Sequence, residues 1–403
     1  MPVNPLNQTP NASRLHITLL GRRNAGKSSL VNALSGQNTA LVSDTAGTTT
    51  DPVYKPMELH PLGPCVLIDT AGFDDEGTLG ALRVGKTREV LDQTDLAVIV
   101  LTAGQTDTSL EAEWLGTLQS RHIPVVAAVN KADCLPSCQA AGANCIPPLA
   151  ASIPHVLLSA RSGEGIDQLK EALVSAAPKD FELESITGHL AGEGDHVLLV
   201  APQDIQAPKG RLILPQVQVI RDLLDHHAAV SIVSTDQLDH ALTLYKAPPK
   251  LIITDSQVFS YVYDRCPEGT KLTSFSVLLA RYKGDIDLYV RGAAAVDTLR
   301  ETDRVLILEA CSHNPLDGDI GRIKIPALLR KKAGAGLSID VRSGKDIPDD
   351  LSPYALAVHC GGCMFNRSHV LSRIGRCVEQ GVPVTNYGIL IAKLSGILDK
   401  VIW

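Results

Sequence analysis

The chain has 403 residues, a formal net charge of −7, 44% hydrophobic and 20% charged residues. This length allows two or three domains with cores of their own, and the composition excludes a largely disordered chain. The negative charge argues against a general nucleic-acid binder, and the lack of any run of about 18 apolar residues argues against a membrane span.

Residues 1–13 are rich in Pro and Asn and lack an apolar core, so we expect a disordered tail rather than a signal peptide. The nine cysteines then indicate a reducing, cytoplasmic setting. In a reducing compartment, clustered Cys and His residues indicate metal binding rather than disulfide bonds.

A phosphate-binding loop opens the first predicted domain, residues 14–180. An apolar run at 15–20 predicts a strand, and residues 21–28 complete the pattern G-x-x-x-x-G-K-S. Its glycines let backbone N–H groups wrap phosphates, Lys27 reaches the β- and γ-phosphates, and the Ser28 hydroxyl binds Mg²⁺. Ser29 starts the helix whose N-terminus faces the anion.

Four further motifs, in register, predict that the nucleotide is GTP or GDP. In the loop at 47–51, Thr49 is expected on Mg²⁺ and the γ-phosphate. Asp69 follows a predicted strand and should hold the Mg²⁺ shell, while the Gly72 N–H can sense the γ-phosphate. Asp133 can accept from the guanine N1–H and 2-amino groups, which adenine does not offer in that pattern.

Ser159 and Ala160 then close over the base. Lys27, Thr49 and Gly72 are the predicted catalytic residues. The full predicted nucleotide-binding set is Asn24, Gly26, Lys27, Ser28, Ser29, Thr49, Asp69, Gly72, Asn130, Lys131, Asp133, Ser159 and Ala160.

This domain resembles the translation-factor-related GTPases of the Era and TrmE kind. Asn24 matches the P-loop asparagine that many of them use to hold K⁺ beside the phosphates, so the resemblance implies K⁺ here. Phe73 stands where Ras-like enzymes carry a water-orienting Gln. We therefore expect slow hydrolysis, helped by K⁺ or a partner. Three further cysteines, Cys134, Cys138 and Cys145, are interpreted as incidental loop thiols.

Residues 181–260 predict a small α/β unit in β-α-β-α-β order without a catalytic signature. By elimination, we interpret this unit as a dimerisation module. Its predicted strands are 196–201, 230–233 and 251–254, and its predicted helices are 216–224 and 237–245.

The third predicted domain, residues 261–403, carries a metal-ligand pattern. A strand at 305–309 precedes the C-x-H motif at 311–313, and one at 355–358 precedes the H-C-x-x-C motif at 359–363. The 45 residues from 314 to 358 separate the two motifs. If the two strands are parallel neighbours, both motifs emerge at the carboxyl edge of one sheet, where open α/β sheets bind ligands.

The donor set leaves the metal open between zinc and iron–sulfur. Zn²⁺ would take four of the five Cys and His groups in a closed tetrahedron. A [4Fe–4S] cluster prefers thiolates, and the two motifs offer three of them. One of the four irons would therefore have a histidine, a weak ligand or an open position. The thiolates on offer are Cys311, Cys360 and Cys363, and the histidines are His313 and His359. We interpret Cys65, Cys266 and Cys377 as core or incidental residues.

Nearly the whole chain resembles the maturation GTPases of [FeFe]-hydrogenase, the HydF family. The resemblance is carried by the C-x-H…H-C-x-x-C set and by the stretches at 47–53, 207–215, 273–276 and 280–285. It implies a scaffold of three α/β domains: the GTPase, a dimerisation domain and a [4Fe–4S] domain, with the cluster at the carboxyl edge of a parallel sheet. It further implies that Cys311, Cys360 and Cys363 bind the cluster, and that His313 and His359 are the motif's histidines.

The same resemblance implies the partners. Proteins of this family accept a di-iron precursor from two radical-SAM maturases and pass it to apo-[FeFe]-hydrogenase. It also implies a homodimer or a larger homo-oligomer, and we expect neither nucleic acid nor a membrane as a partner.

Two other functions would give different sequence features. An RNA- or ribosome-associated GTPase with a structural zinc domain would predict a basic, aromatic-rich surface, whereas aromatic residues make up 4% of this negatively charged chain. A radical-SAM enzyme would need a C-x-x-x-C-x-x-C run, which the sequence lacks.

Overall fold

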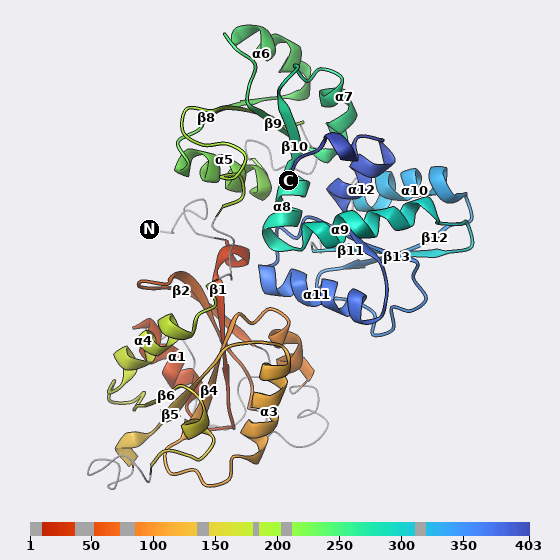
Figure 1. The fold of residues 1–403 in the computed structure, drawn as a ribbon. Coiled ribbons are helices and arrows are strands. Elements are labelled where there is room, and N and C mark those ends of the chain that lie inside the picture. The colour runs from red at the N-terminus through yellow and green to blue at the C-terminus, as the bar shows by residue number, and fades with distance from the viewer. Residues whose placement is uncertain are drawn as a thin grey trace. The chain divides into compact units, whose positions relative to one another are not determined.

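The structure is a computed structural model that describes residues 10–36, 52–72, 85–134, 145–179, 185–202, 212–310 and 320–403. The chain divides into two compact units, Met1–Phe181 and Glu182–Trp403 (Figure 1).

The first unit is built on a six-stranded sheet in the order β2-β3-β1-β4-β5-β6. β2 runs antiparallel to β3, and the other described strands pair in parallel. β1 and β4 are almost continuously apolar because both of their faces are covered. The strands are β1 (Leu15–Leu20), β2 (Val53–Leu59), β3 (Gly63–Asp69), β4 (Leu96–Thr102), β5 (Val125–Asn130) and β6 (His155–Leu157).

Helices cover both faces of this sheet. α1 (Lys27–Ser35) and α4 (Ile166–Ala176) pack on one face, and α3 (Ser109–Ser120) packs on the other (Figure 1). Because β3, β1, β4, β5 and β6 pair in parallel, their carboxyl ends lie at one edge of the sheet. The predicted nucleotide motifs follow strands at this edge.

The second unit contains two four-stranded parallel sheets. The first has the order β10-β9-β7-β8. It includes β10, a short and half-polar strand that the sequence pattern does not predict. This strand lies beyond residue 260, the predicted end of the second domain. Its elements are β7 (His196–Val200), β8 (Ala229–Val233), β9 (Leu251–Thr254), β10 (Lys271–Ser274), α5 (Leu214–Asp225), α6 (Leu238–Leu244), α7 (Phe259–Tyr263) and α8 (Phe275–Lys283).

The other sheet of this unit has the order β12-β11-β13-β14. α11 covers one face, while α10 and α12 cover the other (Figure 1). The elements are β11 (Arg304–Glu309), β12 (Ser338–Ser343), β13 (Leu356–His359), β14 (Val384–Asn386), α9 (Ile286–Ala293), α10 (Ile325–Ala333), α11 (Arg367–Glu379) and α12 (Tyr387–Leu394).

Two contacts explain how α9 is set in place. The Asp285 side chain caps it by accepting a hydrogen bond from the Leu288 N–H, which fixes the start of the helix at Ile286. Gly292 lies against β14, where an added Cβ would come within 1.9 Å of the Val384 carbonyl oxygen. Only glycine allows this close approach.

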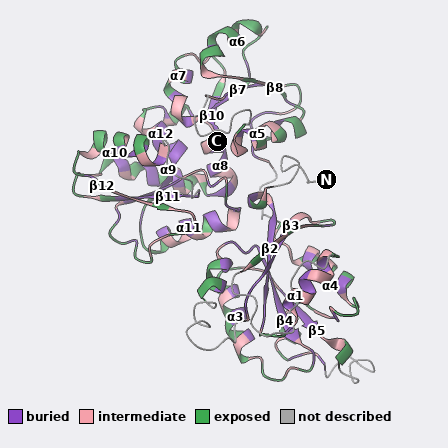
Figure 2. Ribbon diagram, turned by 180° about the vertical axis from the view of Figure 1, so that it is seen from behind, coloured by how far each residue is buried: buried purple, intermediate pink, exposed green. Residues whose placement is uncertain are grey.

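A single buried core joins the two sheets of the second unit. It includes Leu198 and Ile252 from one sheet, Val277 from α8, and Leu308 and Ala357 from the other sheet. The strands and inward helix faces are accordingly the buried parts of the ribbon (Figure 2). The described part of the chain contains no helix that is both long and apolar enough to cross a membrane.

These observations confirm the predicted class: an α/β protein with a P-loop domain followed by further α/β domains built on parallel sheets.

Candidate functional site

The predicted phosphate loop lies between β1 and α1. Gly26 adopts φ +94°, and a Cβ there would lie 2.3 Å from Asn130 Nδ2. Lys27 is buried, and its Nζ donates to the carbonyl oxygens of Gly21 at 2.8 Å and Arg22 at 3.0 Å. The ammonium therefore lies over the loop whose N–H groups would surround the phosphates.

A hydroxyl–carboxylate pair stands beside this loop. Ser28 Oγ donates to Asp69 Oδ2 at 2.5 Å, at the point where β3 ends. Burial raises the pKa of Asp69, against the opposing effects of the Ser28 hydrogen bond and the Lys27 charge. Within the described residues, Asp69 Oδ1 is buried and has no hydrogen-bond partner. A buried oxygen without a donor fits a divalent cation, so Ser28 and Asp69 suit Mg²⁺.

Two residues are predicted to sense the γ-phosphate, Gly72 and Thr49. Gly72 is half-buried just after Asp69. Thr49 lies outside the described residues, and its role stays a prediction.

Asn130 connects the phosphate loop to the base loop. Its Nδ2 donates to the Ala25 carbonyl at 2.9 Å, and its Oδ1 accepts from the Ala160 N–H at 2.9 Å. Both ends of the amide are thus engaged within the protein. This arrangement indicates a residue that positions the two loops.

The carboxylate of the base motif is at the surface. Asp133 is exposed, and a hydrogen bond with the Ser159 side chain is the main cause that lowers its pKa. The neighbouring Lys131 has a positive φ of 65°. An exposed, ionised carboxylate is what recognition of the guanine N–H donors requires.

One contact of the phosphate loop was not predicted. The Arg22 guanidinium donates to Glu111 at 2.9 Å and to Asp107 at 3.0 Å, and Glu111 is fully buried on α3. A charged residue on the inward face of an amphipathic helix was the available sequence signal. This ion pair ties the loop to α3.

The strands that precede the two cysteine motifs, β11 and β13, end at the same edge of the β12-β11-β13-β14 sheet. β11 and β13 are parallel neighbours, with Leu308 opposite His359. The Ala310 N–H donates to Cys360 Sγ at 3.1 Å, and the Gly362 N–H does so at 3.4 Å. Cys311 follows Ala310 directly in the chain, although Cys311 and His313 lie outside the described residues.

The turn after β13 is shaped by a glycine. Gly362 has φ +63°, and a Cβ there would lie 2.9 Å from Val370 Cγ2. Cys360 and Cys363 on either side are half-buried. Burial raises the pKa of Cys360 to about 11, while the N–H groups of Gly362 and Ala310 act in the opposite direction.

His359 is fully buried beside these cysteines. Its Nδ1 lies 2.7 Å from the Cys360 carbonyl oxygen, and burial followed by the Arg373 charge lowers its pKa to about 3. The ring is therefore neutral, with Nδ1 as the donor. In the part of the chain that the structure describes, Nε2 is buried without a hydrogen-bond partner. A neutral imidazole nitrogen with a lone pair is a suitable metal ligand.

Residues of other elements hold the carbonyl groups of this turn. Lys283 of α8 is buried, and its Nζ donates to Phe365 O at 2.6 Å, with longer contacts of 3.4 Å to Gly362 O and Cys363 O. Asn386 Nδ2 donates to Cys360 O at 3.1 Å. Sequence reasoning gave neither residue a role, because their contacts are with segments distant in the chain.

Over the described ranges, no group of three Cys, His, Asp or Glu side chains is placed to hold a metal ion. The predicted group needs Cys311, which these ranges do not include. Among the cysteines interpreted as incidental, Cys134 is exposed and Cys138 is outside the described residues. Cys145 differs from that interpretation, because it is buried and disulfide-bonded.

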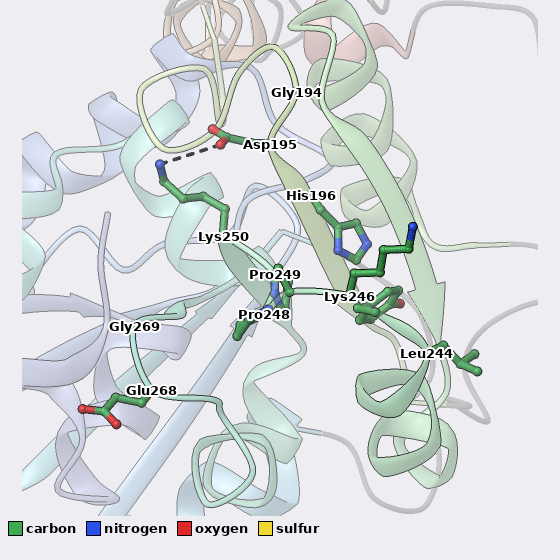
Figure 3. A pocket seen from close by; sticks show the side chains of 12 residues that line it. Gly194, Asp195, His196, Leu244, Lys246, Pro248, Pro249, Lys250, Glu268 and Gly269 are labelled. Atoms are coloured by element: carbon green, nitrogen blue, oxygen red, sulfur yellow. Dashed lines mark ion pairs between the residues drawn. The ribbon is translucent and has the colours of Figure 1, made fainter.

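A separate hollow of about 670 Å³ lies at the amino-terminal edge of the second unit's first sheet (Figure 3). Lys250 Nζ lies 3.7 Å from Asp195 Oδ1, and His196 pairs with Ser231 at 3.0 Å. These groups already have partners. The hollow also lies opposite the edge where such sheets bind ligands, so we assign it no function.

Taken together, the fold and the site define a multidomain P-loop GTPase. Family models match three successive segments: 50S ribosome-binding GTPase at 16–131, hydrogen maturase F dimerization domain at 186–284, and hydrogen maturase F tetramerization domain at 287–403. The chain belongs to the hydrogen maturase F (HydF) family of GTPases.

The curated relatives include the tRNA modification GTPase MnmE of Bordetella petrii, 34% identical over 165 residues, which are 40% of this chain and 34% of the relative. The MnmE of Desulfotalea psychrophila is 31% identical over 160 residues, 40% of this chain and 34% of that one. The chain thus spans about a third of the length of these relatives.

Among solved structures, Aquifex aeolicus Era is 16% identical, with 57% of this chain and 98% of that chain covered and a TM-score of 0.37. S. thermophilus NFeoB is 22% identical, with 40% and 64% covered and a TM-score of 0.32. At these TM-scores the structural likenesses carry no functional argument.

Proposed function

We propose that this chain is a GTP-hydrolysing scaffold that carries a [4Fe–4S] cluster during the maturation of [FeFe]-hydrogenase. In this role it takes up a di-iron precursor made by two radical-SAM maturases and delivers it to apo-hydrogenase. It acts in the cytoplasm as a homodimer or larger homo-oligomer. The order of the three family domains supports this proposal.

In the GTPase half, Lys27 neutralises phosphate charge, and the loop around Gly26 binds the phosphates through its N–H groups. Ser28, Asp69 and Thr49 would hold Mg²⁺, with Asn24 beside K⁺; these cations would offset the charge that develops on the phosphates during transfer. Gly72 senses the γ-phosphate.

The guanine base is read by a separate group of residues. Asp133 accepts from the base, and Ser159 holds the Asp133 carboxylate by a hydrogen bond. Asn130 acts by positioning Ala25 and Ala160, so its contribution to nucleotide binding is indirect.

In the cluster half, Cys311, Cys360 and Cys363 are the proposed thiolate ligands. A cluster bound by three cysteines would supply one iron with a further coordination position. His359 offers a buried, neutral Nε2 close to the turn, and His313 is the corresponding residue of the other motif.

The single observation that carries the cluster site is the hydrogen bond from the Ala310 N–H to Cys360 Sγ at 3.1 Å. It brings the residue just before Cys311 into contact with the sulfur of the second motif. Consecutive Cα atoms are only about 3.8 Å apart. This contact of the residue that precedes Cys311 with the Cys360 sulfur supports the proposal that the two motifs share one cluster.

A second candidate is an RNA- or ribosome-associated GTPase with a structural zinc domain. It is favoured by the names of the relatives, which are tRNA modification GTPases, and of the matched 50S ribosome-binding GTPase family. These matches support the GTPase part, whereas residues 186–284 and 287–403 match the hydrogen maturase domains.

The test is an EPR spectrum of anaerobically reconstituted, dithionite-reduced protein, with iron and zinc counted in the same sample. We expect a reduced [4Fe–4S] signal with about four irons per chain. One zinc per chain with a silent spectrum would contradict the cluster and favour the RNA-associated GTPase.

A further inference from the structure

Arg373 is a charged side chain in the core of the third domain. It lies on α11, the helix that follows the H-C-G-G-C turn, and it is only 2% exposed. Its neighbours on the same helix face, Val370, Ile374 and Cys377, are also buried. This position would ordinarily be occupied by an apolar residue.

The contacts of Arg373 are with backbone carbonyl groups. Its guanidinium donates to Gly344 O at 3.1 Å, and at 3.4 Å to Glu309 O and Asp346 O. Its Cζ lies 5.3 Å from the centre of the Phe365 ring. Glu309 O belongs to the segment that leads into Cys311, so the guanidinium contacts the strand end that precedes the first cysteine.

Among the described residues, no carboxylate pairs with this charge. Within the residues that the structure describes, Arg373 forms no ion pair, and its Nε is buried without an acceptor. The nearby Glu309 carboxylate is engaged by Arg322 at 3.1 Å and by the Ser343 hydroxyl at 3.0 Å. A guanidinium stays protonated in proteins, and burying it without an anion is costly.

The anions that could balance it are the cysteine sulfurs once they bind a cluster as thiolates. Burial lowers the pKa of Arg373, and negative charge on Cys360 and then on Cys377 acts in the opposite direction. A cluster held by three cysteine thiolates carries negative charge, and its one-electron reduction adds one more. A fixed cation beside it therefore favours both binding and the reduced state.

We propose that Arg373 is the buried counter-charge of the cysteine-bound iron–sulfur cluster, a positioning residue that favours cluster binding and sets its reduction potential. This inference rests on the proposed cluster site. It assigns a role to a residue that lies ten positions beyond Cys363 and outside the ligand motif.

The test compares two variants in the full chain by EPR-monitored redox titration after anaerobic reconstitution. Arg373→Gln keeps an amide donor but removes the charge, whereas Arg373→Lys keeps the charge but not the guanidinium shape. We expect the midpoint potential of Arg373→Gln to fall by about 59 mV or more, a tenfold change for one electron. Arg373→Lys should stay close to wild type.

Arg376→Gln is the matched control. It removes the same charge from the same helix, but Arg376 pairs with exposed Asp349 at 3.2 Å rather than with the cluster region. Its potential and iron content should equal those of wild type. Circular dichroism of the cluster-free proteins checks that each variant folds.

The outcomes separate the two proposals. If wild type takes up no iron, the cluster proposal fails, and this inference fails with it. If wild type loads and Arg373→Gln has the same iron content and potential, only this inference is wrong. Loss of loading in Arg373→Gln alone supports it. The inference is overturned if both variants fold but neither takes up iron. It is also overturned if the midpoint potential of Arg373→Lys shifts by about 59 mV or more, because the shape of the side chain, rather than its charge, would then matter. If Arg373→Gln does not fold, the midpoint potential of Arg373→Lys still tests the inference.

Discussion

The sulfur of Cys360 accepts a hydrogen bond from the backbone N–H of Ala310 at 3.1 Å, although the two residues are 50 positions apart in the chain. The bond exists because β11 and β13 are parallel neighbours that end at the same edge. A backbone N–H directed at sulfur favours the thiolate over the thiol. Four predictions follow from this contact and from the geometry of the GTPase domain.

Cys360→Ser should abolish iron uptake and leave GTP hydrolysis close to the wild-type rate, because the cysteine belongs to a compact unit separate from the GTPase domain. Iron per chain and phosphate release from GTP are the two measurements. Cys266→Ser, at a half-buried cysteine outside the motif, is the control and should load iron normally. Loss of both activities in Cys360→Ser would contradict the separation.

Lys27→Ala should have the opposite effect. The Lys27 ammonium lies over the phosphate loop, and its loss should slow GTP hydrolysis by about 10²-fold or more, as removal of a group that stabilises transition-state charge does. Iron uptake should be unchanged. Lys170→Ala, at a partly exposed α4 residue paired with Asp167, controls for charge. Normal turnover in Lys27→Ala would refute the phosphate-loop assignment.

Asn130→Ala should weaken GDP binding and destabilise the first unit together. It leaves Ala25 O and the Ala160 N–H without the partners they have at 2.9 Å. Unpaired buried groups of this kind cost about 1–3 kcal/mol. Calorimetric GDP titration and thermal unfolding measure the two effects. Weaker binding with unchanged unfolding would instead place Asn130 in direct contact with the nucleotide.

Asp69→Asn should stabilise the Mg²⁺-free protein at neutral pH. Burial raises the pKa of Asp69 above its ordinary 3.8, so the folded state binds the proton more tightly than the unfolded state does. The stability from this group is fully present below pH 3.8 and is lost as the pH rises through the raised value. The gain in Asp69→Asn should therefore grow with pH over that range.

The stability gained by Asp69→Asn is measured by thermal unfolding in EDTA, from below pH 3.8 up to neutral pH. Mg²⁺ with GDP should reverse the order, because the cation stabilises only the protein with the carboxylate. Asp167→Asn, at an exposed aspartate on α4, is the control. A difference between Asp69→Asn and wild type that does not vary with pH would show that the charge of Asp69 is not its cause.

Much of the site was predictable because its functional residues lie in short, contiguous sequence motifs. The strand over 15–20 and the loop at 21–28 follow from a local pattern, and β1 and α1 occupy those places. Two apolar runs predicted the strands that precede the cysteine motifs, and β11 and β13 confirm them. That these two strands pair side by side was only a condition of the sequence argument, which the structure meets. Short or half-polar strands such as β10 and β12 were missed, because edge strands lack a continuous apolar run.

By itself, the sequence determined the nucleotide motifs, the candidate thiolates and the family, because each is a local arrangement of residue types. The tertiary structure alone decided which distant groups surround them. Asn130 joins two loops, Lys283 of α8 holds the carbonyl groups of the cysteine turn, and Arg373 is buried beside that turn. Such contacts depend on how helices pack across parallel sheets, and no periodicity within one segment records which residue of another segment it will meet.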